Sequence, residues 1–187
     1  MVPALCLLGV ALVAGLVWWG VRSSPEGVAG QAAPVTQAQA LTSGEFTYSV
    51  VAGPDRAEDC AANSYGTVVD WFADNPCDAV SRGLYETTVG QARALVSVVR
   101  VTMPDADLAG QLKTVTDTDG TGNVNDLIRD GTVDLPDAPS VARGEYHSVL
   151  DGRHLTIIET DFYDGHSDPA LLERISTDAT RLTSLLG

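Results

Sequence analysis

The side chains best suited to metal chemistry lie in the segment DTDGTGNVND, which runs from residue 117 to residue 126. Its spacing is typical of a calcium-binding loop, in which alternate side-chain oxygens turn inward around a hard cation and a glycine supplies the sharp turn. Ile128 stands where such a loop needs a bidentate glutamate, which weakens the predicted affinity for calcium. The alternative is a glycine-rich turn that caps a following helix. The predicted calcium ligands are Asp117, Asp119, Thr121 and Asn123.

A second group of candidate ligands follows later in the chain, in the segment DFYDGHSD. Asp164, His166 and Asp168 would ligate a divalent metal if a turn gathered them, because carboxylates and imidazole both bind such ions. Asp164 and His166 would also serve as the polar pair of an unrecognised hydrolase. The alternative is an Asp-Gly turn followed by a helix that Asp168 caps. The chain has none of the sequence motifs of serine hydrolases, zinc proteases or P-loop proteins.

Two cysteines, Cys60 and Cys77, lie in the polar part of the chain. An even pair is typical of a disulfide formed outside the cytoplasm, and two buried free thiols are the alternative. A continuous helix between them would separate their Cα atoms by about 25 Å, whereas a disulfide needs about 4.4–6.8 Å. If the cysteines are bonded, the helix between them must be short. We then expect it to run from an N-cap at Ser64 to Asp74, with both flanks folding back.

Periodicity predicts the remaining elements: alternation of apolar and polar residues indicates strands, and apolar residues three and four apart indicate helices. The dipeptide Asp151-Gly152 between two β-branched runs indicates a hairpin. Pro169 after Asp168 is typical of a helix start, and an apolar stripe follows it. The predicted strands are 46–51, 79–89, 93–103, 145–150 and 154–160, and the predicted helices are 64–74, 105–116 and 168–186.

This order of elements predicts an α+β domain over residues 44–187. Because helices alternate with strand pairs, we expect a two-layer domain whose sheet is mostly antiparallel and whose helices lie on one face. A ferredoxin-like βαββαβ core with an added strand and helix fits the order.

An uncharged run opens the chain and ends in Trp18 and Trp19, just before Arg22. About 20 apolar residues are enough for a helix to cross a bilayer, and tryptophan favours the membrane surface. We therefore predict a transmembrane anchor or uncleaved signal over 1–22 and a flexible linker over 23–43. Cleavage of the first segment would make the domain a secreted one. Arg22 favours a cytoplasmic domain, whereas the cysteines favour the extracytoplasmic side of the cell membrane.

The formal net charge of −14 lies almost entirely outside the N-terminal run. Such an acidic surface repels nucleic acid, so we expect no nucleic-acid partner. The expected partners are the membrane, through the N-terminal helix, and an envelope protein or a small ligand, through the domain. No cofactor is expected besides calcium.

Several short motifs, taken together, resemble a group of actinobacterial membrane-anchored or secreted proteins of unknown function. The likeness covers residues 46–175, and it implies an extracytoplasmic domain with a disulfide. It implies no activity and no catalytic residue. The motifs are Cys60 followed by Tyr65-Gly66, Asn75-Pro76-Cys77, Val96-Ser97-Val98 leading into Met103-Pro104-Asp105, and Gly120-Thr121-Gly122-Asn123-Val124.

The sequence therefore favours a single-pass membrane protein whose extracytoplasmic domain acts by binding or assembly of envelope components without catalysis. One alternative is a calcium-stabilised envelope module that uses the loop at 117–126. The other is a hydrolase that uses Asp164 and His166.

Overall fold

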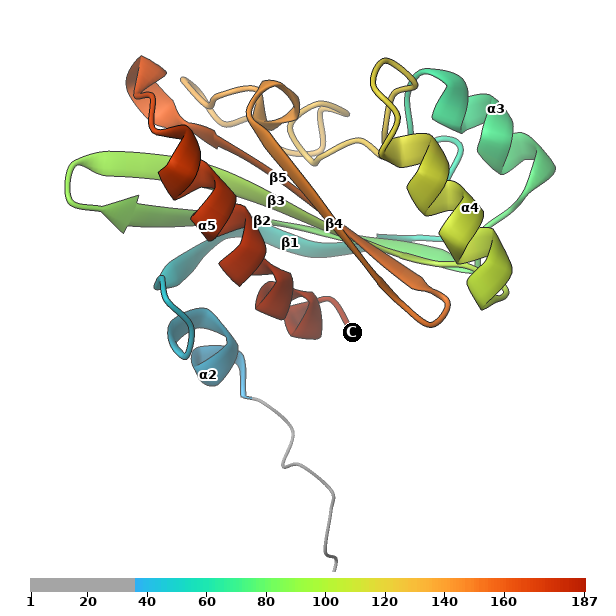
Figure 1. Ribbon diagram of the computed structural model, residues 1–187, viewed down its shortest axis with the longest axis horizontal. Coiled ribbons are helices and arrows are strands. Elements are labelled where there is room, and N and C mark those ends of the chain that lie inside the picture. The colour runs from blue at the N-terminus through green and yellow to red at the C-terminus, as the bar shows by residue number, and fades with distance from the viewer. Residues whose placement is uncertain (1–35) are drawn as a thin grey trace, which may run out of the picture. The chain divides into compact units, whose positions relative to one another are not determined.

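Within residues 36–187, five strands form a sheet in the order β1-β2-β3-β5-β4, and every neighbouring pair is antiparallel (Figure 1). This range is the part of the chain that the computed structural model describes. The predicted strands are confirmed, although β1 continues beyond its predicted end through a bulged stretch. The strands are β1 (Tyr48–Ala57), β2 (Ala79–Val89), β3 (Ala92–Thr102), β4 (Glu145–Asp151) and β5 (His154–Phe162).

Strand β3 lies at the centre of the sheet and is buried on both sides. Successive residues of a strand point to opposite faces. Ala94, Val96 and Val98 are fully buried on one face, called here the even face, and Leu95 and Val101 are fully buried on the other, the odd face. Such a strand needs cover on both faces, and the cover comes from different parts of the chain.

Helix α5 (Pro169–Ala179) and the 3₁₀ helix η3 (Thr180–Leu185) cover the even face. Asp168 caps α5 by accepting a hydrogen bond from the Leu171 amide at 3.1 Å, and Pro169 occupies the first turn, as predicted. The apolar cluster on this face joins Ile175, Ala179, Leu182 and Leu186 to Tyr48, Val96, Val98, Ile158 and Phe162.

Helices α3 (Thr67–Asp74) and α4 (Ala106–Thr116) pack on the odd face instead. Figure 1 shows them side by side, toward the other end of the sheet from α5. Val68 of α3 and Leu112 of α4 are fully buried in the cluster that also contains Val101 of β3. The predicted two-layer domain with helices on one face is therefore wrong. The apolar stripe of a helix identifies its buried side but not the face of the sheet that it contacts.

The long connection between α4 and β4 covers the rest of the odd face. It contains the 3₁₀ helix η1 (Val141–Arg143), and a further 3₁₀ helix, η2 (Tyr163–Gly165), follows β5. Val141 and Tyr163 pack with Leu95 in a separate apolar cluster. The odd face therefore carries two apolar clusters rather than one.

Arg82 of β2 anchors this connection to the sheet. The residue is 3% exposed, and its guanidinium donates to Asp55 at 2.7 Å and to the Asn125 carbonyl at 3.2 Å. It also forms an ion pair with Asp130. A buried arginine needs such partners, because an unpaired buried charge is strongly destabilising.

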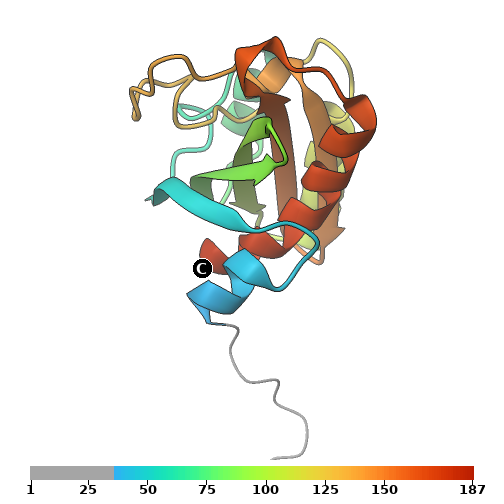
Figure 2. The ribbon, with the colours of Figure 1, turned by 90° about the vertical axis from the view of Figure 1, so that its left-hand side faces the viewer.

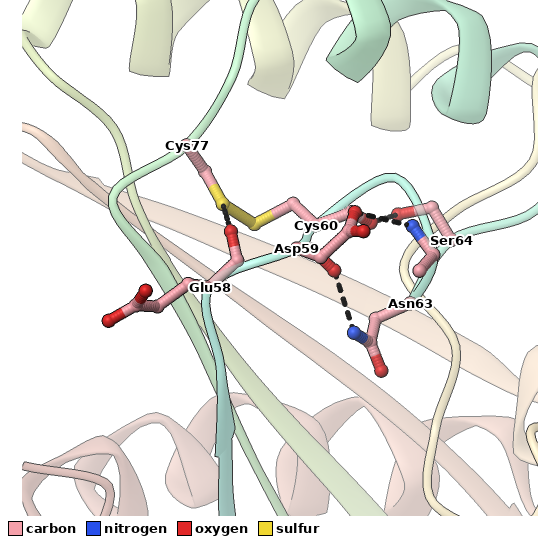
Figure 3. The surroundings of a disulfide bond; sticks show 7 residues. Glu58, Asp59, Cys60, Asn63, Ser64 and Cys77 are labelled. Carbon is pink, nitrogen blue, oxygen red and sulfur yellow. Dashed lines mark hydrogen bonds between the residues drawn. A yellow bond between two sulfur atoms is a disulfide. The ribbon is translucent and has the colours of Figure 1, made fainter.

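A disulfide between Cys60 and Cys77 closes the segment that carries α3 (Figure 3). The Cα atoms of the two cysteines are 6.1 Å apart, and the predicted pairing and the short helix between them are confirmed. The helix begins at Thr67, after an N-cap at Gly66, rather than at the predicted Ser64. The Ser64 hydroxyl instead donates to the Cys60 carbonyl at 2.7 Å, in a turn that precedes the helix.

The disulfide also explains why the core is not ferredoxin-like. In a split βαβ unit, the helix crosses the sheet and joins two parallel strands. Here the bonded cysteines return the chain to the point where β1 ends, and β2 pairs directly with β1 in the antiparallel sense. Helix α3 therefore lies in a side loop of a hairpin, and the predicted ferredoxin-like core is wrong.

The predicted transmembrane anchor or signal at 1–22 lies outside the described residues. Between residues 36 and 187, no helix combines the length and the apolar character needed to cross a bilayer. The predicted fold class is corrected accordingly: the described fold is an α+β domain with an antiparallel sheet, and it contains no membrane-spanning helix.

The end of the segment that was expected to be a flexible linker, 23–43, forms helix α2 (Gln37–Thr42). The Thr36 hydroxyl caps this helix by accepting a hydrogen bond from the Gln39 amide. Figure 2 shows α2 beside the C-terminal η3, where Ala40 is buried. Part of the predicted linker is therefore helical and packs against the domain.

Candidate functional site

A pocket of about 360 Å³ opens on the odd face, between its two apolar clusters. A row of polar side chains crosses three neighbouring strands here, and its members on β4 and β5 line the pocket. Ser97 of β3 lies opposite Glu159 of β5, which lies opposite Tyr146 of β4. The loop after α4 and the residues before α3 complete the walls, which include Tyr65, Asp117, Asp119, Asn123, Tyr146 and Glu159.

Glu159 is the buried carboxyl group of this pocket. The residue is 5% exposed, and its Oε1 accepts a hydrogen bond from Asn123 Nδ2 at 3.0 Å. Its second oxygen, Oε2, accepts no hydrogen bond from residues 36–187. Burial raises the pKa of Glu159 to about 7; the charge of Asp126 acts in the same direction, whereas Asn123 and Arg129 oppose it. A carboxyl group that titrates near neutral pH inside a pocket is typical of a functional site.

Asp117, at the C-terminal end of α4, forms a second wall together with β4. Its carboxylate accepts hydrogen bonds from the Tyr146 hydroxyl at 2.9 Å and from the Ser148 hydroxyl at 2.7 Å. It also forms an ion pair with Lys113, one helical turn earlier. Burial opposes ionisation of Asp117, but the hydrogen bonds from Lys113, Ser148 and Tyr146 outweigh it and lower the pKa of this carboxyl group. Asp117 is therefore ionised at neutral pH and held in one orientation.

Tyr65 forms the wall on the side of α3. The guanidinium carbon of Arg129 lies 3.6 Å from the centre of its ring, which is a cation–π contact. Burial raises the pKa of Tyr65, and the nearby charge of Glu159 raises it further. The phenol is therefore neutral at physiological pH and can donate a hydrogen bond.

Two glycines bring the loop after α4 directly against the backbone before α3. The Tyr65 amide donates to the Asn123 carbonyl at 2.9 Å. Gly122 has a φ of +91°, and a Cβ at this position would lie 2.1 Å from the Tyr65 carbonyl oxygen. A Cβ on Gly66 would lie 2.4 Å from a backbone oxygen of the same loop. Glycine at both positions allows the two backbone segments to cross in direct contact, and this contact fixes Tyr65 relative to Asn123.

The predicted calcium ligands are spread around this pocket. Asp117 and Asp119 line it, whereas the Thr121 hydroxyl donates to the Val115 carbonyl at 2.7 Å and the Asn123 side chain is bonded to Glu159. Nowhere in residues 36–187 are three His, Cys, Asp or Glu side chains grouped so that they would hold a metal ion. Calcium binding by this loop stays a prediction.

The second predicted ligand set, Asp164, His166 and Asp168, has turn and cap contacts in the structure. Asp164 lies in η2 with a φ of +57°. The His166 ring packs edge-on against Phe162, with ring centres 4.7 Å apart. Asp168 caps α5 through the Leu171 amide. Metal binding or hydrolysis at these residues stays a prediction.

The sequence interpretation missed Glu159, Tyr146 and Tyr65 as site residues. A signal for Glu159 was present, because Leu155, Ile157 and Glu159 share one face of a predicted strand. Leu155 and Ile157 are buried, so a carboxylate follows two buried apolar positions on the same face. No comparable signal marks Tyr65, which reaches the pocket through backbone contacts with a distant loop.

Comparisons of the chain with models of protein families, with curated proteins and with solved structures returned no match. The resemblance to actinobacterial envelope proteins therefore stays a prediction. Of its implications, the pairing of Cys60 with Cys77 is confirmed.

Proposed function

We propose that this domain binds a small polar molecule in the pocket around Glu159. The observation that carries the proposal is a carboxyl group, 5% exposed, whose Oε2 accepts no hydrogen bond from residues 36–187. Oε2 is not among the fully enclosed unpaired atoms of the described residues, so it reaches the open pocket, where a donor group of a ligand can pair with it. The volume of about 360 Å³ lies within the range of small-molecule pockets, about 300–1,000 Å³.

The contacts around the pocket support its role as a binding site. Asn123 holds one oxygen of Glu159, and the glycine crossing at Gly122 holds the loop that carries Asn123. Arg82 ties the following part of the same connection to the sheet through Asp130. These contacts position the walls and leave the space between them open, as a ligand site requires.

The test is an NMR titration of ¹⁵N-labelled full-length protein with choline, N-acetylglucosamine and succinate as separate probes. We expect at least one probe to shift the backbone amides of Gly122, Asn123, Tyr146 and Glu159. A large side chain at the rim, introduced by Ala142→Trp, should abolish these shifts. If all three probes leave the pocket amides unchanged, the proposal is wrong.

A matched control separates blockage of the pocket from general damage. Ala73 is exposed on α3 and, unlike Ala142, does not line the pocket. Ala73→Trp should therefore leave the probe-induced shifts as they are in the parent protein.

We also propose that the domain is extracytoplasmic, which the Cys60–Cys77 disulfide supports, because stable disulfides are rare in the bacterial cytoplasm. The test is thiol alkylation of intact cells without reductant, followed by mass spectrometry of the full-length protein. A linked Cys60–Cys77 peptide is expected. Alkylation of both Cys60 and Cys77 would contradict the proposed location.

A further inference from the structure

We infer that the molecule bound in this pocket, if the proposed function holds, is a small organic cation of the ammonium class whose charge lies against Glu159. The groups that select it are the carboxylates of the lining and the two tyrosines beside them, Tyr65 and Tyr146.

The lining of the pocket is negatively charged. Asp117, Asp119 and Glu159 contribute carboxyl groups, and the described lining residues include no lysine, arginine or histidine. Lys113 is already paired with Asp117, and Arg129 is stacked on Tyr65. The net charge of −14 on the whole chain adds attraction for a cation and repulsion for an anion.

One carboxyl oxygen of Glu159 is open to the pocket. Its Oε1 is bonded to Asn123, a neutral amide, and its Oε2 accepts no hydrogen bond from residues 36–187. Of the charged groups that influence it, Asp126 opposes its ionisation and only Arg129 favours it. A ligand ammonium would supply the positive charge, and for a primary amine the donor, that this buried carboxyl group lacks.

The aromatic walls favour an organic cation over a metal ion. Tyrosine rings attract ammonium groups and also contact their methyl or methylene surface. A bare divalent ion needs several oxygens at about 2.0–2.6 Å. The acidic side chains of residues 36–187 do not converge in that way, and about 360 Å³ accommodates a molecule of several heavy atoms.

The experiment compares choline with 3,3-dimethylbutan-1-ol, a neutral alcohol of nearly the same shape, by calorimetric titration of the full-length protein. Choline should bind, and the alcohol should bind at least about tenfold more weakly. Choline keeps its charge at every pH, so its affinity should follow ionisation of Glu159. With the pKa of Glu159 at about 7, the affinity should rise roughly tenfold between pH 6 and pH 8.

Substitutions test whether Glu159 is the group that determines the affinity for choline. Glu159→Gln keeps the volume and the acceptor for Asn123, and it should weaken choline binding at pH 8 about tenfold. Glu145→Gln is the matched control, because Glu145 lies opposite Thr160 and therefore on the even face. It should leave the affinity unchanged. Asp119→Asn, at an exposed position on the rim, should weaken binding a few-fold without affecting the core.

The outcomes separate this inference from the proposed function. Equal binding of choline and the neutral alcohol would overturn the cation class and retain the binding site. Pocket shifts with N-acetylglucosamine or succinate but not with choline would do the same. Calcium binding that displaces choline and is lost in Asp119→Asn would replace the organic cation with a metal. Unchanged pocket amides with every probe would overturn the proposed function itself.

Discussion

The two faces of the sheet are covered in different ways. On the even face, α5 and η3 follow one another in the chain and supply one continuous apolar cluster. On the odd face, α3, α4 and the α4–β4 connection supply two clusters, and the polar row through Glu159 lies between them. The pocket of the odd face lies where these separate segments meet and contains the buried Glu159. The even side also has a pocket, of about 390 Å³, which Tyr85, Ser184 and Leu185 help to line.

Buried polar groups occur on both faces of the sheet. On the even face, the buried Ser176 hydroxyl is bonded to the Thr160 hydroxyl at 3.1 Å, and both groups are fully buried. On the odd face, the buried carboxyl group of Glu159 keeps one oxygen unbonded to the described residues. Three buried polar atoms on the even side, Arg100 Nε, Thr180 Oγ1 and Arg181 Nη1, also have no partner among the described residues. The odd face is therefore distinguished by the pocket beside Glu159 rather than by an unpaired polar atom alone.

The largest effect should come from the even face. Ile175 is fully buried in its cluster, and Ile175→Ala should lower the free energy of unfolding by about 4 kcal/mol through lost burial and a cavity. Urea unfolding measures the loss. The pocket amides should shift with a bound probe as in the parent protein; loss of probe binding would show that the two faces are not independent.

On the odd face, the largest effect should come from the close contact of Gly122 with the backbone of Tyr65 and Gly66. Gly122→Ala places a Cβ against the Tyr65 carbonyl and should cost about 3 kcal/mol together with probe binding. Gly120 is the control, because its φ is +81° but a Cβ at this position would meet no other segment of the chain within 4 Å. Gly120→Ala should cost about 1 kcal/mol. Equal costs in urea unfolding would show that the close approach is unimportant.

Glu159→Gln should change stability in the opposite direction at high pH. The pKa of Glu159 rises from an ordinary value of 4.5 to about 7 on folding, so the native state holds its proton more tightly than the unfolded chain. The stability present below pH 4.5 is therefore lost as the pH rises to 7, by up to about 3 kcal/mol. At pH 8 the glutamine variant should be more stable than the parent protein, and at pH 4 the two should be nearly equal.

The parent–variant difference in urea unfolding, measured at a series of pH values, tests this expectation. Glu145→Gln, on the other face of the sheet, should show no such trend. A difference that stays constant with pH would indicate that Glu159 is not perturbed by burial.

The smallest effect should come from the rim of the pocket. Lys113 and Asp117 are about one third exposed, so their ion pair is screened by solvent. Lys113→Met should lower the free energy of unfolding by about 0.5 kcal/mol, and less at high salt. A loss above about 2 kcal/mol would mean that this pair anchors the odd face as firmly as the apolar clusters do.

Sequence periodicity was sufficient for the five strands and for helices α3, α4 and α5, and the even cysteine pair indicated the disulfide. Helix α2 was missed, because it lies in a segment without strong apolar periodicity. Periodicity was insufficient for the faces, since the stripes of α4 and α5 look alike and the sheet has two buried sides. The sequence contained information against the ferredoxin-like core. Cys60 follows the end of β1 and Cys77 precedes the start of β2, so a bond between them returns the chain as in an antiparallel hairpin.

The candidate site was predictable only in part. Glu159 is recognisable because it follows two apolar residues on the same face of its strand. The loop at 117–126 was predicted as a candidate site from its carboxylates and glycines. In the structure, Gly122 permits close contact with the backbone of Tyr65 and Gly66, a role that the calcium-loop prediction did not include. That contact joins residues far apart in the chain, and local spacing carries no information about it.

The contact between Tyr65 and the loop that carries Asn123 gives the disulfide a second role, besides closing the segment that contains α3. Tyr65 lies within the loop that Cys60 and Cys77 close, and its backbone is bonded to the loop that carries Asn123. In the oxidised protein, this pocket wall is preorganised, so a ligand does not have to offset the conformational entropy of ordering it. Formation of the Cys60–Cys77 bond would then raise the affinity of the proposed pocket for its ligand.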